Sequence, residues 1–104
     1  MSRVDTLKEF LRDDSDDSFS RYALAMEYVK LGKLEDAIHE FETVAHNDPD
    51  YVATYYQLAK AFERDGRTDD ATQTYRTGIA VAKRLGDNHT LEELASALEL
   101  LVEG

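Results

Sequence analysis

Two short stretches of the sequence decide the fold: Gly32-Lys33-Leu34-Glu35-Asp36-Ala37 and, 34 residues later, Gly66-Arg67-Thr68-Asp69-Asp70-Ala71. Between residues 18–51 and 52–85 the same offset superimposes seven identical residues: Tyr22 on Tyr56, Leu24 on Leu58, Ala25 on Ala59, Gly32 on Gly66, Asp36 on Asp70, Ala37 on Ala71 and Thr43 on Thr77. Aromatic residues also replace one another, because Tyr28 falls on Phe62 and Phe41 falls on Tyr75. A fixed period of this length predicts a stack of repeated units rather than one irregular globule.

Each copy has the pattern of two amphipathic helices joined by a tight turn. In the first copy Leu24, Ala25 and Tyr28 form one helical stripe. Gly32 follows, where the helix must end and the chain must reverse. Ala37 then opens a second stripe at a place where two helices cross closely, because a larger side chain there would push them apart. The repeated unit is therefore a pair of antiparallel helices.

These residues resemble the signature of the tetratricopeptide repeat family. The signature positions hold Leu24, Ala25, Tyr28, Gly32, Ala37, Phe41 and Pro49 in residues 18–51, and Leu58, Ala59, Phe62, Gly66, Ala71 and Tyr75 in residues 52–85. The second copy departs from the signature at Gly78, where a small alanine is common, and at Lys83, which replaces the closing proline. Arg21 and Tyr55 stand where the family often carries tryptophan. The resemblance implies an all-α, right-handed stack of helix pairs that binds proteins or peptides.

The whole chain is expected to form one domain, with a capping helix at each end of two full repeats. We assign residues 1–17 to an N-terminal cap, 18–51 and 52–85 to the repeats, and 86–104 to a C-terminal cap. The six helices are expected at 3–12, 18–31, 35–47, 51–65, 68–85 and 90–102. The acidic run at 13–17 is interpreted as a turn and helix start, with a cation site as the alternative. Thr90 and Glu93 have the spacing of a capping box.

Composition narrows the classes of partner. Among the 104 residues 22 are acidic and 12 basic, which gives a net charge of −10. Because nucleic acids and anionic membranes repel such a surface, neither is expected as a partner. The chain has no cysteine, and it has no apolar run of membrane-spanning length and no signal-peptide pattern, so a cytoplasmic location is expected. Asp exceeding Glu and Arg exceeding Lys hints at a salt-adapted cytoplasm, although an ordinary acidic protein has the same composition.

The predicted function is that of a non-catalytic adaptor without a cofactor. The resemblance implies that the first helix of each pair lines a concave groove, and helical geometry then selects the stripe that faces it. The expected groove residues are Phe19, Tyr22, Met26, Val29, Tyr56, Lys60, Glu63, Glu92, Ser96 and Glu99. The Lys and Asn clamp of family members that bind acidic C-terminal peptides is absent. A ligand with an apolar or aromatic anchor and a basic residue would suit this groove.

Three alternatives stay open at this level. Phe19 and Tyr22 could pack against the N-terminal helix rather than face a ligand. The C-terminal helix could pair with a second copy through Leu100, Leu101 and Val102, making a structural homodimer. Finally, a metal-dependent enzyme could use His39, Glu42 and His46, which have ligand-like spacing, although solvated polar residues explain that pattern better.

Overall fold

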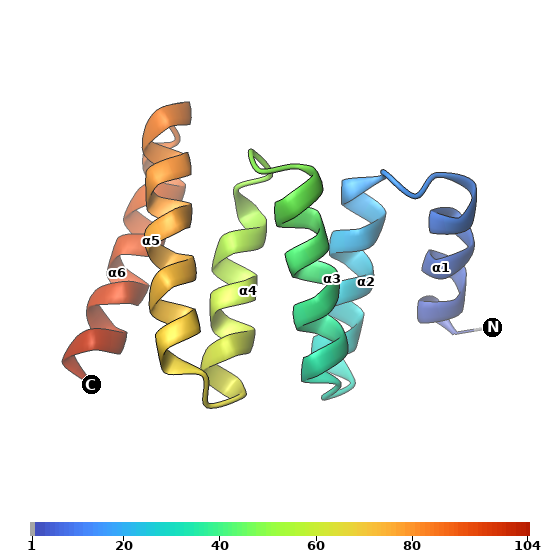
Figure 1. Ribbon diagram of the computed structural model, residues 1–104, viewed down its shortest axis with the longest axis horizontal. Helices are drawn as coiled ribbons and strands as arrows, with labels where there is room; N and C mark the ends of the chain where they lie inside the picture. Colours follow the sequence, from blue (N-terminus) through green and yellow to red (C-terminus); the bar gives the residue numbers. More distant parts are fainter. Residues whose placement is uncertain (1) are drawn as a thin grey trace.

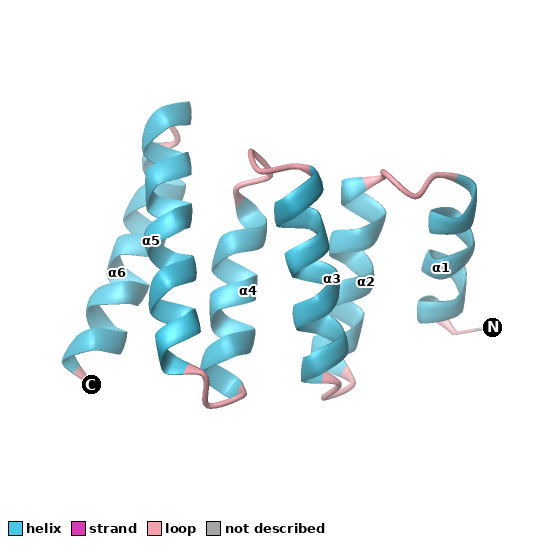
Figure 2. Ribbon diagram, in the orientation of Figure 1, coloured by secondary structure: helices cyan, strands magenta, loops and turns pink. Residues whose placement is uncertain are grey.

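The computed structural model describes residues 2–104, and these residues form six α-helices stacked side by side along the longest axis of the molecule (Figure 1). The helices are α1 (Arg3–Asp13), α2 (Ser18–Lys30), α3 (Leu34–Asn47), α4 (Ala53–Arg64), α5 (Thr68–Leu85) and α6 (Asn88–Glu103). Helices and loops account for all of the described residues, and no strand occurs among them (Figure 2). Every predicted helix is present, with ends within two residues of the prediction.

The helices are arranged in antiparallel pairs that form two faces. In Figure 1, α3 and α5 lie towards the viewer, and α2, α4 and α6 lie behind them. Gly32 reverses the chain between α2 and α3 with φ 75°, and Gly66 does the same between α4 and α5 with φ 76°. Glycine suits this left-handed backbone conformation because it has no Cβ to clash with the following carbonyl. The repeated sequence therefore encodes a repeated turn.

Apolar side chains between the helices form two adjoining core clusters. The first lies mainly between α1, α2, α3 and α4, and the second between α4, α5 and α6. The four alanines at the expected crossing points, Ala25, Ala37, Ala59 and Ala71, are completely buried. Their small size lets neighbouring helices approach closely, as the sequence pattern predicted.

Aspartates begin two of the three helices on the rear face. Asp17 caps α2 by accepting hydrogen bonds from the Ser20 amide at 3.2 Å and the Ser20 hydroxyl at 2.6 Å. Asp87 caps α6 by accepting from the Thr90 amide at 3.1 Å and its hydroxyl at 2.7 Å. The predicted capping box at Thr90 is therefore wrong. The chain leaves α5 through Gly86, and Asp87 becomes the N-cap residue of α6. The helix therefore begins at Asn88, two residues before the predicted start at Thr90.

Gly78 departs from the repeat signature because three helices meet at its Cα. A Cβ added there would lie 2.6 Å from the Cβ of Tyr55 in α4 and 3.0 Å from Cδ1 of Leu94 in α6. Real Cβ atoms do not approach other atoms that closely. The glycine thus admits Tyr55, whose hydroxyl donates to the Pro49 carbonyl at 2.6 Å and ties α4 to the preceding turn.

Candidate functional site

Tyr22 lies at the centre of an aromatic group on the first repeat. Its ring meets Phe41 of α3 edge-on at a centroid distance of 5.7 Å and Tyr51 at 5.4 Å. Burial raises the pKa of the Tyr22 phenol, Tyr51 and Glu93 raise it further, and a hydrogen bond with Gln57 opposes that rise. These influences come from α4 and α6 as well as from the preceding turn. The Tyr22 ring thus lies between Phe41 of α3 and Tyr51 in the turn before α4.

Tyr56 repeats this arrangement on the second repeat with a charged addition. Its ring meets Tyr75 of α5 edge-on at 6.4 Å, and Lys60 Nζ lies 5.5 Å from the centre of the Tyr56 ring. Lys60 also pairs with Glu63 at 3.6 Å, and the Tyr75 hydroxyl donates to the Glu63 carboxylate. Burial, and then the hydrogen bond to Glu63, hold the pKa of Tyr75 far above its usual value. One continuous polar and aromatic cluster thus joins α4 to α5.

The remaining predicted groove residues differ in exposure. Phe19 is 71% exposed and packs on no core cluster, which contradicts the alternative that it serves as packing against α1. Met26 and Val29 are half-buried and pack against the first core cluster, as Tyr22 does, so they are less exposed than the sequence reasoning assumed. The α6 residues Glu92, Ser96 and Glu99 are exposed.

Three residues of this region were not singled out by the sequence reasoning as contact residues: Tyr51, Gln57 and Glu93. Gln57 and Glu93 occupy equivalent places on α4 and α6, one residue beyond Tyr56 and Glu92, when α6 is aligned with α4 at an offset of 36 residues. That offset was available in the sequence and could have identified them. Tyr51 lies just before α4, outside the helical stripe, and only its contact with Tyr22 places it here.

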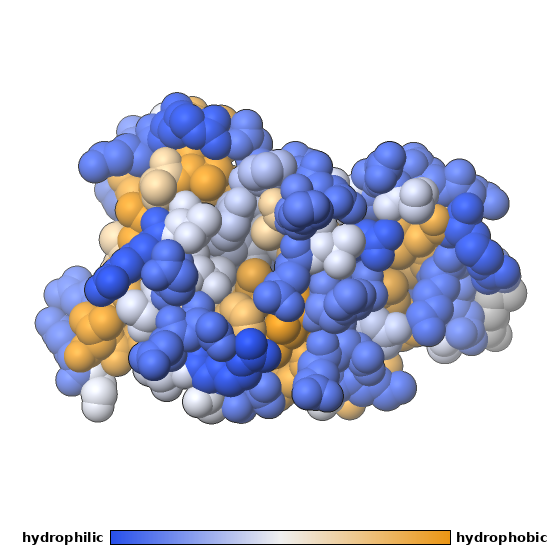
Figure 3. All heavy atoms as spheres, in the orientation of Figure 1, coloured by the Kyte–Doolittle hydropathy of each residue, from blue (hydrophilic) through white to orange (hydrophobic). Residues whose placement is uncertain are grey.

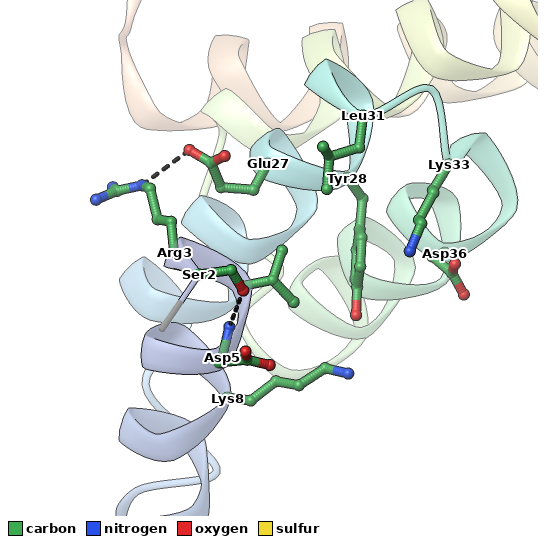
Figure 4. Close-up of a pocket in the computed structure, with 10 residues that line it drawn as sticks. Ser2, Arg3, Asp5, Lys8, Glu27, Tyr28, Leu31, Lys33 and Asp36 are labelled. Atoms are coloured by element: carbon green, nitrogen blue, oxygen red, sulfur yellow. Dashed lines mark hydrogen bonds and ion pairs between the residues drawn. The ribbon is translucent and has the colours of Figure 1, made fainter.

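A separate cavity of ≈ 530 Å³ opens between α1, the end of α2 and the start of α3, away from the predicted groove. Figure 4 shows Arg3 directed at Glu27 on one side, Lys33 and Asp36 on the other, and the Tyr28 ring between them. Arg3 Nε lies 2.8 Å from Glu27 Oε1. Bases and acids are present here in equal number, so the lining selects neither anions nor cations.

The face formed by α3 and α5 is largely hydrophilic, with hydrophobic atoms visible mainly between the helices (Figure 3). His39, Glu42 and His46 are exposed residues of α3. Within residues 2–104, no group of three or more His, Asp or Glu side chains lies close enough together to hold a metal ion. No helix in the same range is long and apolar enough to cross a bilayer.

Comparison with known proteins identifies the fold family. The sequence model of the tetratricopeptide repeat family matches residues 22–88, more than half of the chain. The chain belongs to the tetratricopeptide repeat family. The predicted fold class, an all-α stack of tetratricopeptide helix pairs, is confirmed.

Two similar proteins share sequence with this chain, and a third shares its fold. A tetratricopeptide repeat domain protein from Salinibacter ruber, solved by NMR, is 46% identical, with 85% of this chain and 89% of that chain covered and a TM-score of 0.80. A TPR repeat-containing protein of Pseudomonas aeruginosa is 28% identical over 98 residues, which are 94% of this chain and 93% of the relative. The TPR2B domain of yeast Sti1, solved in a complex with pHsp70, is 17% identical with a TM-score of 0.89, covering 96% of this chain and 80% of that one. The last likeness concerns the fold alone.

Proposed function

We propose that this tetratricopeptide repeat protein is a non-catalytic adaptor that holds a protein or peptide segment along the face formed by α2, α4 and α6. The family is one of protein-interaction scaffolds, and a structural neighbour was solved with a bound protein ligand, pHsp70. The proposal concerns a contact surface defined by the predicted groove residues, Phe19, Tyr22, Met26, Val29, Tyr56, Lys60, Glu63, Glu92, Ser96 and Glu99. We call this surface the groove.

The observation that carries the proposal is that the groove side chains change from apolar and aromatic at the α2 end to acidic at the α6 end. At the α2 end Phe19 is largely exposed beside the partly accessible Tyr22 and Met26. Large apolar side chains of this kind are unusual on a solvated helix and typical of interfaces. At the α6 end the exposed residues are acidic, Glu92 and Glu99. A uniform solvated surface would show neither trend.

The groove therefore favours a segment with an apolar or aromatic anchor at one end and a lysine or arginine at the other. The anchor would bury apolar area against Phe19 and Met26, and the basic residue would lie beside Glu92 and Glu99. Lys60 is already occupied by Glu63 and by the face of the Tyr56 ring. It therefore adds little repulsion towards a basic ligand. An extended segment and a helix are both compatible with this surface.

The experiment is a retention assay with the immobilised full chain and an extract of its own cells, followed by identification of the retained protein and measurement of its affinity. Phe19→Ser is the variant for the apolar end, because its side chain is exposed and its loss should leave the unfolding midpoint unchanged. We expect about tenfold or greater weakening, as for an interface anchor. Tyr56→Ala should also weaken binding, but it removes the contact with Tyr75, so its stability must be measured alongside.

The acidic end is tested separately with Glu92→Gln and Glu99→Gln together. The double variant should bind the same ligand more weakly, and its affinity should depend less on salt. The reason is that salt screens the attraction between the two glutamates and a basic ligand, which the variant lacks. Glu42→Gln on α3 is the matched control, since it changes an exposed glutamate on a helix outside the groove. Equal losses from Glu42→Gln and from the groove variants would contradict the proposal.

A further inference from the structure

The sequence of α6 retains the packing surface of a first helix, although no second helix follows it in the described residues. At the 36-residue offset Leu94 and Ala95 correspond to Leu58 and Ala59 of α4, and Leu98 corresponds to Phe62. All three residues of α4 are buried: Ala59 lies in the cluster that α4 shares with α5 and α6, and Leu58 and Phe62 lie in the first core cluster. The alanine marks the point where a first helix admits its second helix at close range.

In α6 this surface is only partly covered. Leu94 is completely buried, whereas Ala95 is exposed, Leu98 is half-buried and Val102 is 60% exposed. The stripe consists of Ala95 and Val102, which are exposed, and Leu91 and Leu98, which are half-buried against the second core cluster; we call it the α6 flank. In Figure 1 α6 is the last helix of the row, with α5 as its neighbour on the inner side and no helix beyond it. Hydrophobic atoms are visible at this end in Figure 3.

The charges beside the flank are all of one sign. Helix α6 contains Glu92, Glu93, Glu99 and Glu103 and no lysine or arginine. Glu92 and Glu99 lie on the helix surface next to Ala95 and Val102, because residues three and four apart share a face. A helix that covered the flank would therefore gain from basic residues along its edge.

A second copy of this chain fits the flank poorly. At the 34-residue offset α1 aligns with α3, which is the second helix of a pair, and Phe10 on α1 is 55% exposed. Arg3, however, occupies the place that corresponds to Ala37 of α3. Arg3 is held there by its ion pair with Glu27, so α1 does not offer the small residue that a close crossing needs. Two α6 helices facing each other would bring glutamates together, and each chain carries a charge of −10.

We propose that the α6 flank docks an amphipathic helix of a partner protein, in the place on α6 that corresponds to the site of the second helix on α2 and α4. That helix has a small residue opposite Ala95, an aromatic or branched apolar residue four positions later, and lysine or arginine beside Glu92 and Glu99. The groove lies on a neighbouring stripe of α6, and Glu92 and Glu99 border both surfaces. A helix on the flank and a segment in the groove therefore compete for these two charges.

The probe is a capped synthetic peptide with the sequence of α5, residues 68–85, which contains the crossing residue Ala71 followed by Tyr75 and has three basic and two acidic residues. The matched control is the α3 peptide, residues 34–47, which has the same signature residues, Ala37 and Phe41, but four acidic residues and no lysine or arginine. Each is titrated into the isotope-labelled full chain. We expect saturable amide shifts at the α6 flank with the α5 peptide, and binding weaker by about tenfold or more with the α3 peptide.

The variant Ala95→Gln should abolish the shifts without lowering the unfolding midpoint, because Ala95 is exposed. Ala80→Gln makes the same change at an exposed position of α5 and should leave the shifts intact. The proposal is overturned if the α5 peptide produces no shifts at about millimolar concentration, the weakest affinity of interest. Shifts centred on Leu58 and Ala59 would instead show displacement of α5 and would also overturn it.

Light scattering across a dilution series tests whether the flank instead binds a second copy of this chain. A monomeric mass at all concentrations is expected. A dimer that Ala95→Gln dissociates would assign the flank to a second copy and overturn the proposal for a partner helix.

Discussion

The two helix pairs α2–α3 and α4–α5 share one apolar frame but satisfy their polar groups differently. Both have an edge-on aromatic contact between the pair, Tyr22 with Phe41 and Tyr56 with Tyr75. Both turn on a glycine with almost the same φ. Apolar and small residues set the frame of both pairs, whereas each polar connection is specific to its repeat.

The equivalent positions Arg21 and Tyr55 show this difference clearly. In α2, Arg21 donates to Glu40 of α3 at 2.6 Å and to the Ser15 carbonyl at 2.9 Å. In α4, Tyr55 packs across Gly78 and donates to Pro49. A long polar side chain and an aromatic ring thus do the same task, which is to tie the first helix to the second helix and to the preceding turn.

The largest expected effect tests the space around Tyr55. Gly78→Ala should lower the free energy of unfolding by about 3 kcal/mol, because the new methyl group clashes with the Cβ of Tyr55. In the first pair, Val44 stands at the equivalent position and is buried. Urea unfolding is the measurement. The helix propensity of alanine alone predicts an unchanged or higher free energy of unfolding. That result would show that α4 and α6 can move away from residue 78 to make room for the methyl group.

The next effect tests the Arg21 connection. The Arg21 and Glu40 side chains are only 19% and 14% exposed, so Arg21→Met should cost about 2 kcal/mol by leaving Glu40 without its partner. Combining Arg21→Met with Glu40→Met should recover part of this loss. The control is Arg3→Met: Arg3 is 65% exposed, and its partner Glu27, 15% exposed, keeps Lys30 at 3.6 Å, so the urea midpoint should change little. If Arg21→Met lowers the free energy of unfolding no more than Arg3→Met does, Arg21 is an ordinary surface residue.

A smaller expected effect is the loss of stability at acid pH in α2 and α6, which have aspartate caps. Helix α4 has no side-chain cap and should not show it. The hydrogen bonds from the Ser20 hydroxyl and amide lower the pKa of Asp17, and those from Thr90 lower the pKa of Asp87, both below the ordinary value of 3.8. A lowered folded-state pKa adds stability above the unfolded-state pKa, and this stability is lost as the pH falls through the folded-state pKa. The caps of α2 and α6 should therefore weaken below about pH 4.

The measurement for the caps is the thermal midpoint as a function of pH. Asparagine can cap a helix but does not titrate, so Asp17→Asn with Asp87→Asn should flatten the acid limb of the wild-type curve. Hydrogen exchange at the first turn of α4 should show no comparable difference between the two proteins. Parallel acid limbs for wild type and the double variant would refute a role for these caps.

The smallest effect concerns the counterpart of Ser20 in the second repeat. At the 34-residue offset Thr54 replaces Ser20 and Tyr51 replaces the capping Asp17. The Thr54 hydroxyl is consequently the one buried side-chain polar atom without a hydrogen-bond partner among the described residues. Thr54→Val should stabilise the chain by about 0.5 kcal/mol. Ser20→Ala, which removes a bonded hydroxyl, should do the opposite, and the same sign for both would contradict this explanation.

Most of the fold could be predicted because its determinants are local and repeated. Helix ends followed from glycines, acidic runs and the spacing of apolar residues, and the crossing points followed from alanines at the repeat offset. The groove was predicted in outline only. Its stripe is a matter of helical geometry, but the burial of Tyr22, Met26 and Val29 depends on residues from α3 and the turn before α4.

The sequence by itself determined the pairing of helices, their order and the turns between them, because a period of 34 residues with small and apolar matches has few other physical solutions. Tertiary structure alone decided why Gly78 is a glycine, which polar groups find partners, and which flank of α6 stays uncovered. Each of these depends on how separate helices pack against one another, and no single helical stripe contains that information.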